Sequence, residues 1–331
     1  MPPIIESMDS TLARLSEIPN LTVSRDAPLS AYTRFAIGGP ADIYAETESV
    51  ESFIQALAVA RASGRDFMVM GGGTNLIVSD RGFRGIMLRF VARRILAAGE
   101  RVACDAGAVL QDLVDFSVGR GLAGLETLAG IPGSVGAAVY GNAGAYGHSI
   151  SERVRQVRFF DGACVRVFDN AACEFQYRES VFKRHKDWII FSAELHLTPA
   201  DANALRRTAD DIVKVRNEKF PVTMKCAGSI FKNFLLAELP PAAAAAVPAS
   251  VVREGKVPAA YFLEQVGAKG MSRGDIHVAA YHANLIYNAG AGTAADLCAL
   301  IAELKSRVRR QFAVELEEEV QYVGFADACP V

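Results

Sequence analysis

The 331-residue sequence lacks an excess of charge of either sign. It has 35 lysines and arginines against 37 aspartates and glutamates, a formal net charge of −2. A protein that binds a nucleic-acid polymer needs a strongly basic surface, so we exclude that class. Hydrophobic residues make up 51% of the chain and charged residues only 22%, which also excludes a disordered chain.

The sequence also lacks the spacings with which cysteine and histidine bind metals. None of its six cysteines forms a C-x-x-C pair, and its five histidines show neither H-x-x-x-H nor H-E-x-x-H. We therefore predict no metal site. Scattered cysteines of this kind indicate free thiols in a reducing compartment, so we expect a cytoplasmic protein.

No stretch has the pattern of a signal peptide or a membrane span. The N-terminus has no basic region or long apolar core, and Glu6 and Asp9 interrupt it early. The longest uncharged run, 127–151, is long enough to cross a membrane, but it contains Pro132 and repeated glycines. A continuous helix is not expected there, and we predict no membrane insertion.

Hydrophobic periodicity predicts a mixture of helices and strands, and the length suits about two domains. Consecutive short strands in the middle third are typical of a mixed or antiparallel sheet. These patterns together indicate an α+β fold. Helices are expected at 49–63, 108–120, 200–218, 258–266 and 293–308, and strands at 41–46, 67–73, 282–288 and 314–324.

Glycine is unevenly distributed, with eight of its 28 residues between Gly121 and Gly147. The segment 71–85, GGGTNLIVSDRGFRG, offers backbone N–H groups suited to a pyrophosphate, although it is equally compatible with a tight turn between two strands. The segment 130–147 contains two successive G-x-x-G-x-x-G spacings and suits a flat ring. Two such segments favour an extended dinucleotide over close packing without a ligand.

Three further segments carry candidate catalytic groups. In YRESVFK, Arg178 suits a carboxylate or phosphate, and the alternative is a surface arginine paired with Glu179. In KCAGSIFKNF, Ser229 could donate a proton, and the alternative is an ordinary turn serine. The glutamates at 315–319 are most simply a solvated face of a strand.

Taken together and in this order, the segments resemble the UDP-N-acetylenolpyruvoylglucosamine reductase family. The two glycine segments alone occur across the wider p-cresol-methylhydroxylase-type flavoproteins, whereas the full ordered set is specific. The resemblance covers nearly the whole chain after about residue 21. It is carried by YTRFAIGGPADIYAE, GGGTNLIVSDRGFRGIMLRF, GLETLAGIPGSVGAAVYGNAGAYG, YRESVFK, GSIFKNF, HANLIYN and LEEEVQYVG.

The resemblance implies an α+β fold with a two-lobed FAD-binding domain of the p-cresol-methylhydroxylase type, like that of vanillyl-alcohol oxidase. A C-terminal α+β substrate-binding domain would follow. The implied divisions are an N-terminal extension at 1–20, the FAD-binding domain at 21–218 with lobes at about 21–90 and 91–218, and the substrate domain at 219–331.

The implied activity is the reduction of UDP-N-acetylglucosamine enolpyruvate to UDP-N-acetylmuramate in peptidoglycan synthesis, with FAD as cofactor and NADPH as co-substrate. Flavin N5 would give a hydride to C3, and a proton would be added at C2. By their match to family motifs, Arg178 would stabilise the enolate, Ser229 would donate the proton and Glu319 would stabilise the enol. We expect a monomer with non-covalent FAD, and His148 is the nearest candidate for covalent attachment.

The resemblance also assigns binding positions. For the cofactor these are Arg34, Gly71, Gly72, Gly73, Thr74, Asn75, Gly133, Ser134, Gly136, Asn142, Gly144 and Ala145. For the substrate they are Tyr177, Arg216, Lys219, Asn233 and Asn284.

Two departures from the family pattern are visible. The last motif reads L-E-E-E-V where the family more often has L-E-P-E-V, and simple alternation puts Glu318, not Glu319, on the apolar side. The short segment after YRESVFK lacks the long tyrosine loop, as in the shorter subtype of the family. The alternative functions are another FAD oxidoreductase of the same architecture acting on an alcohol or sugar, and a nucleotide-binding regulator without turnover.

Overall fold

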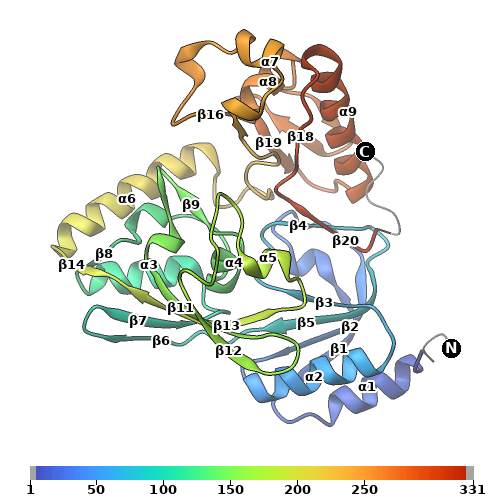
Figure 1. Ribbon diagram of the computed structural model, residues 1–331. Helices are drawn as coiled ribbons and strands as arrows, with labels where there is room; N and C mark the ends of the chain where they lie inside the picture. The colour runs from blue at the N-terminus through green and yellow to red at the C-terminus, as the bar shows by residue number, and fades with distance from the viewer. Residues whose placement is uncertain (1–4, 326–331) are drawn as a thin grey trace. The chain divides into compact units, whose positions relative to one another are not determined.

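The computed structural model describes residues 5–325, which form two compact units (Figure 1). The first unit comprises the chain up to Asp26 together with Asp42–Gly72 and Gly85–Lys219. The second comprises Ala27–Ala41, Gly73–Arg84 and the chain from Phe220 onward. Two short segments that the sequence analysis placed in the FAD-binding domain therefore belong to the second unit.

The helices are short except for two. Those of the first unit are α1 (Met8–Ser16), α2 (Val50–Ala62), α3 (Leu110–Gly119), α4 (Val135–Tyr140), α5 (Val181–Arg184) and α6 (Ala202–Lys219), and those of the second are α7 (Pro241–Ala246), α8 (Ala259–Gln265) and α9 (Ala294–Phe312). Among residues 5–325, no helix is both long and apolar enough to cross a membrane.

The strands form several small sheets. Those wholly or mainly in the first unit are β1 (Thr22–Pro28), β2 (Pro40–Thr47), β3 (Phe67–Met70), β5 (Phe83–Phe90), β6 (Ile95–Ala98), β7 (Arg101–Asp105), β8 (Leu122–Ala123), β9 (Gly144–Ala145), β10 (His148–Ser149), β11 (Val154–Phe160), β12 (Val165–Asp169), β13 (Ile189–His196) and β14 (Thr198–Pro199). Those of the second unit are β4 (Leu76–Val78), β15 (Phe234–Leu235), β16 (Lys256–Val257), β17 (Ser272–Arg273), β18 (Ile276–Ala279), β19 (His282–Asn288) and β20 (Gln321–Val323).

The two larger sheets of the first unit have separate cores. One sheet has the order β1-β2-β5-β3, and α2 packs on it through Phe53, Leu57 and neighbouring alanines. Phe53 and Phe90 make edge-to-face contacts with Phe191 of the other sheet, at centroid distances of 5.7 and 5.0 Å. Such aromatic contacts bury large apolar surfaces and stabilise the junction between the two lobes of this unit.

The second sheet of this unit has the order β12-β11-β13-β7-β6, and all its neighbouring strands are antiparallel. The sequence predicted a mixed or antiparallel sheet here, and the prediction is confirmed. Helices α3, α4 and α6 contribute Leu113, Val139, Leu205 and other apolar residues to the core beside this sheet. The glycine-rich segment 130–147 contributes α4 to this core and β9 to a small hairpin with β10.

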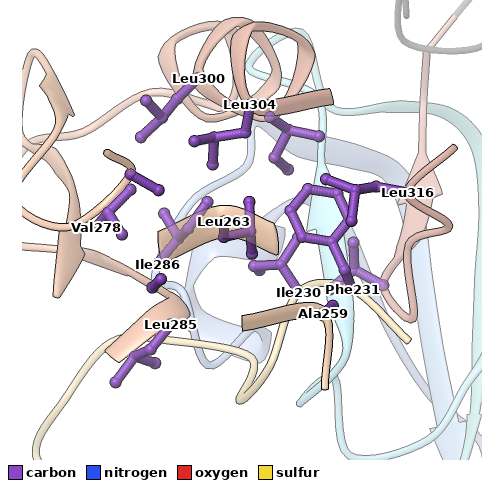
Figure 2. Packing of buried hydrophobic residues seen from close by; sticks show 14 of the residues in the cluster. Ile230, Phe231, Ala259, Leu263, Val278, Leu285, Ile286, Leu300, Leu304 and Leu316 are labelled. Carbon is purple, nitrogen blue, oxygen red and sulfur yellow. The ribbon is translucent and has the colours of Figure 1, made fainter. Parts of the chain in front are cut away.

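The second unit is built around α9 and the three-stranded sheet β17-β18-β19 (Figure 2). Leu300 and Leu304 of α9 pack with Leu263 of α8 and with Ile286 of β19. Its core also includes Phe35, Ile37 and Ile77 from the two N-terminal segments, and β4 pairs in parallel with β20. This unit therefore depends on three separated stretches of chain.

The predicted elements are largely confirmed. The strand at 282–288 and the helices at 49–63, 108–120, 200–218 and 258–266 lie within two residues of their observed bounds. Thr293 caps α9, accepting from Asp296 N, and the side chain of Asp80 accepts from Ala294 N and Ala295 N. The strand predicted at 314–324 is wrong in part, because only 321–323 form a strand.

Candidate active site

The two glycine segments of the first unit meet. A Cβ atom placed on Gly72 would lie 3.3 Å from Gly133 Cα, and one placed on Gly71 would lie 3.1 Å from Ser134 Oγ. The Ser134 side chain caps α4 by accepting from Ala137 N. The sequence could identify each segment as glycine-rich, and the structure adds that side chains at Gly71 or Gly72 would crowd the other segment.

Several of the predicted cofactor positions have structural roles of their own. A Cβ on Gly136 would lie 2.8 Å from Ala106 Cβ, and one on Gly144 would lie 2.4 Å from His148 O. Both glycines are therefore required by close packing within the unit. Ala145 pairs with His148 in the β9–β10 hairpin, and the His148 ring lies 2.9 Å from a carboxylate oxygen of Glu152.

Arg178 lies in a tight turn whose geometry is unusual for an arginine. Gln176 and Glu179 exchange two backbone hydrogen bonds across this turn, and Arg178 has a φ of +57°. A positive φ at the third residue of a turn is normally taken by glycine or asparagine. Strained backbone conformations cluster at functional sites, so this turn is a candidate functional feature.

The side chain of Arg178 is directed to the second glycine segment. Its guanidinium donates to Gly144 O at 2.8 Å and to Asn142 O at 3.4 Å, and it lies 5.0 Å from the centre of the Tyr177 ring. Lys183 donates from Nζ to Arg178 O and forms an ion pair with Glu179, both at 2.8 Å. The turn is thus held from both sides.

Asn142 connects the glycine segment to the Arg178 turn. Its buried side chain donates from Nδ2 to Gln176 O at 2.8 Å and accepts from Ser151 N at 3.3 Å. Ser180 Oγ adds a second connection by donating to Tyr140 O at 2.7 Å. Burial and the Glu179 carboxylate raise the pKa of Tyr140, which keeps its hydroxyl protonated. The sequence resemblance named Asn142 only as a cofactor position and missed this connection.

Arg216 and Lys219 lie at the end of α6 in the same unit. A Cβ placed on Gly130, which has a φ of +74°, would lie 3.1 Å from Arg216 Cδ. The stem of Arg216 therefore crosses the start of the second glycine segment. Gln111 Oε1 accepts from Gly130 N at 2.7 Å and fixes that point of the segment.

The remaining predicted residues belong to the second unit. Gly73 has a φ of +65° and its carbonyl accepts from Arg34 N at 3.2 Å. Asn75 donates from Nδ2 to Glu319 O at 2.7 Å, and its own carbonyl accepts from Gln321 N. The segment 73–75 is thereby joined to the last motif of the chain. Thr74 lies between them in this turn from β3 to β4.

Ser229 lies beside Glu319 along the backbone. Glu319 N donates to Ile230 O at 2.8 Å, and Phe231 forms an antiparallel bridge with Glu318. Ser229 itself forms a bridge with Leu285 of β19. Two of the predicted catalytic residues are therefore brought together by main-chain pairing between segments about 90 residues apart. Asn233, a few residues further on, accepts at Oδ1 from Ala259 N at 3.2 Å.

Glu318, which simple alternation puts on the apolar side, differs from Glu319 in its contacts. Both carboxylate oxygens of Glu318 accept from Lys305 Nζ of α9 at 3.0 Å, and Tyr322 donates to one of them. The Lys305 and Glu318 side chains are each 13% exposed. The Glu318 side chain is thus held by α9 through Lys305, whereas Glu319, next to it, is paired with Ile230 through its main-chain N–H. The only sequence signal for this pair is that Lys305 follows Ile301 at helical spacing on the buried side of α9.

The comparisons with known proteins agree with this organisation. The chain matches the model of an FAD binding domain over residues 41–165 and that of a UDP-N-acetylenolpyruvoylglucosamine reductase C-terminal domain over residues 220–323. Over 94% of its length it is 71% identical to a UDP-N-acetylenolpyruvoylglucosamine reductase of Solibacter usitatus, which it covers completely. It is 37% identical to one of Rubrobacter xylanophilus over 96% of its length and 99% of that protein.

A solved structure gives the same result. The crystal structure of UDP-N-acetylenolpyruvylglucosamine reductase from Thermus caldophilus superposes with a TM-score of 0.70 at 28% identity, covering 92% of this chain and 98% of that one. The matches define a flavin-dependent oxidoreductase, and the predicted α+β fold with its FAD-binding and C-terminal domains is confirmed. The chain belongs to the UDP-N-acetylenolpyruvoylglucosamine reductase family.

Proposed function

We propose that this protein reduces UDP-N-acetylglucosamine enolpyruvate to UDP-N-acetylmuramate with NADPH, through FAD, in peptidoglycan precursor synthesis. The observation that carries the proposal is the strained Arg178 turn, whose guanidinium is held at the second glycine segment. The family relationship supports the same reaction. We place the reaction in the cytoplasm, and the five cysteines within residues 5–325, all free thiols, are consistent with a reducing compartment.

The residues fit an extended flavin dinucleotide. The backbone is exposed at Gly71 and half-buried at Gly72, and Gly72 lies against the second glycine segment with little room for a side chain. Bound FAD would take a hydride from NADPH and pass it to the enol ether. We assign its binding to Arg34, Gly71, Gly72, Gly73, Thr74, Asn75, Gly133, Ser134, Gly136, Asn142, Gly144 and Ala145.

The chain's own contribution is to stabilise and protonate the reduced substrate. Addition of a hydride at C3 leaves negative charge at C2 that spreads into the neighbouring carboxylate. The fixed guanidinium of Arg178 would stabilise that charge, because a cation that is already oriented needs no rearrangement during the reaction. The Ser229 hydroxyl would give its proton to C2, and Glu319 would stabilise the enol form.

Contacts to the sugar nucleotide are assigned to Tyr177, Arg216, Lys219 and Asn233. All can donate hydrogen bonds to phosphate, uracil or sugar oxygens. We expect a monomer that takes the sugar nucleotide and NADPH as substrates.

The test is an absorption spectrum of the purified protein and an assay of NADPH oxidation with and without the enolpyruvyl sugar nucleotide. Turnover that requires the sugar nucleotide supports the proposal, and turnover with a simple alcohol or sugar instead would indicate a different flavin oxidoreductase. A colourless protein inert to NADPH would indicate a regulator. In Ser229→Ala, flavin reduction by NADPH should persist and product formation should fall about 100-fold or more. Ser306→Ala, on the exposed side of α9, is the control and should have full activity.

A further inference from the structure

The segment that carries Ser229 pairs with β19: Lys225 O accepts from Asn288 N at 2.9 Å, and Ser229 itself forms a bridge with Leu285. Gly228, which precedes Ser229, has a φ of +78° and nothing within 4 Å of a Cβ placed on it. Glycine gives the backbone the most conformational freedom of any residue. Because Gly228 separates Ser229 from the pairing at Lys225, the contacts that hold Ile230 and Phe231 directly after the serine help to fix the position of its hydroxyl.

Asn284 of β19 holds the two residues that directly follow Ser229. Its side chain accepts from Phe231 N at 2.9 Å and donates from Nδ2 to Phe231 O at 2.9 Å. Its own carbonyl accepts from Ile230 N at 3.1 Å. Figure 2 shows Ile230 and Phe231 directed into the apolar core of the second unit. Asn284 is 2% exposed, so its side-chain amide satisfies the buried N–H and C=O groups of Phe231, which apolar side chains shield from water.

We propose that Asn284 is a positioning residue that acts through Ser229, rather than a contact to the sugar nucleotide. Both polar atoms of its amide are engaged with Phe231, which leaves the side chain poorly placed to hold a substrate. Loss of these bonds would loosen the backbone directly on the C-terminal side of Ser229. This inference rests on the proposed role of Ser229 as proton donor.

The chain offers a matched control on the same strand. Asn288 is 4% exposed, donates from Nδ2 to Phe35 O at 3.0 Å, and accepts at Oδ1 from Gly290 N and Gly292 N. Asn284→Asp and Asn288→Asp therefore make the same change: each removes one bond to a buried carbonyl and adds a buried carboxylate. The Asn284 side chain bonds to Phe231, close after Ser229, whereas Asn288 reaches the Ser229 segment only through its main-chain N–H, at Lys225, which the substitution leaves in place.

The experiment measures kcat and KM for the enolpyruvyl sugar nucleotide in these variants at a temperature at which circular dichroism shows each to be folded. We expect kcat to fall at least about tenfold in Asn284→Asp, with KM and flavin reduction by NADPH unchanged. Asn288→Asp should lose stability but retain kcat. If Asn284→Asp does not fold, Asn284→Ala, which adds no buried charge, replaces it.

A double variant identifies the route of the effect. If Asn284 acts through Ser229, then Ser229→Ala/Asn284→Asp should be no slower than Ser229→Ala alone, because residues that act as a unit are not additive. A raised KM with normal kcat in Asn284→Asp, or a kcat equal to that of Asn288→Asp, would overturn the inference and leave the proton donor intact. Full turnover by Ser229→Ala would overturn both.

Discussion

The guanidinium of Arg178 donates a 2.8 Å hydrogen bond to the carbonyl oxygen of Gly144, and this bond joins the candidate catalytic arginine to the glycine-rich segment. The arginine adopts a left-handed backbone conformation to do so, with a φ of +57°. The strained backbone bears on the stability of the fold, and the fixed side chain bears on the activity. Substitutions at this position can therefore change the two properties in different directions.

The stability of variants at Arg178 should therefore depend on how easily the new residue adopts a positive φ. Glycine adopts a left-handed conformation freely, whereas an L residue there costs about 1 kcal/mol or more. We predict that Arg178→Gly is more stable than Arg178→Ala by about 1 kcal/mol in urea unfolding, while both lose reduction of the enol ether. Equal stabilities, or Ala above Gly, would show that the turn stores no strain.

Substitution of Gly72 should test the meeting of the two glycine segments. A methyl group there would lie 3.3 Å from Gly133 Cα and 3.4 Å from Ser134 N, so one backbone segment must move. We predict that Gly72→Ala retains less FAD after gel filtration, measured by the ratio of flavin to protein absorbance. Gly119→Ala, at the end of α3 with nothing within 4 Å of the new Cβ, should retain FAD as the original chain does. Equal retention would argue against flavin binding at this junction.

Substitution of Lys305 should be costly because its partner is largely buried. Lys305→Met leaves the Glu318 carboxylate without its cation, and we predict a loss of about 2 kcal/mol in unfolding free energy. Lys305→Met/Glu318→Gln should recover most of that loss, since no unpaired charge remains. Arg309→Met on the same helix breaks the exposed pair with Glu315, at 55% and 61% exposure, and should cost less than about 1 kcal/mol. Similar costs for both single changes would contradict this account.

The buried thiol of Cys104 should make the fold less stable at alkaline pH. Burial, helped by the carboxylates of Asp105 and Asp112, raises its pKa to about 12. An unfolded thiol ionises near pH 8.5, so between about 8.5 and 12 the folded state holds a proton that the unfolded state has released. Unfolding free energy then falls as pH rises, by up to about 1.4 kcal/mol per pH unit from this group. Cys104→Ala should show a shallower decline between pH 8 and pH 10.5, and parallel declines would contradict the prediction.

Local patterns in the sequence were enough to predict most of the helices and strands and the two glycine segments. Ser49 and Thr293 cap helices where the sequence places them, because capping depends on residues only a few positions apart. What the sequence could not supply was long-range pairing. The bonds from Asn142 to Gln176, from Asn284 to Phe231 and from Lys305 to Glu318 join side chains to partners that no spacing rule connects.

The last strand illustrates the same limit. Alternating Val314, Leu316 and Val320 are all buried, as the pattern predicts, but the backbone from 314 to 320 is not a strand. Burial follows from hydrophobicity alone, whereas strand formation requires a neighbouring backbone to pair with. Residues 321–323 pair with β4 along their whole length, and β4 lies more than 200 residues earlier in the chain.

The composition of the second unit constrains the order in which the protein can form during synthesis. Phe35, Ile37 and Ile77 leave the ribosome well before α8, β19 and α9, the elements they pack against. At about 5–20 residues per second, the delay between residue 84 and residue 220 is roughly 7 to 27 s. During that time these apolar side chains lack their final core, while the sheets of the first unit can already form. The growing chain thus exposes a short-lived hydrophobic surface that a chaperone could shield, and it disappears only when the C-terminal segment is made.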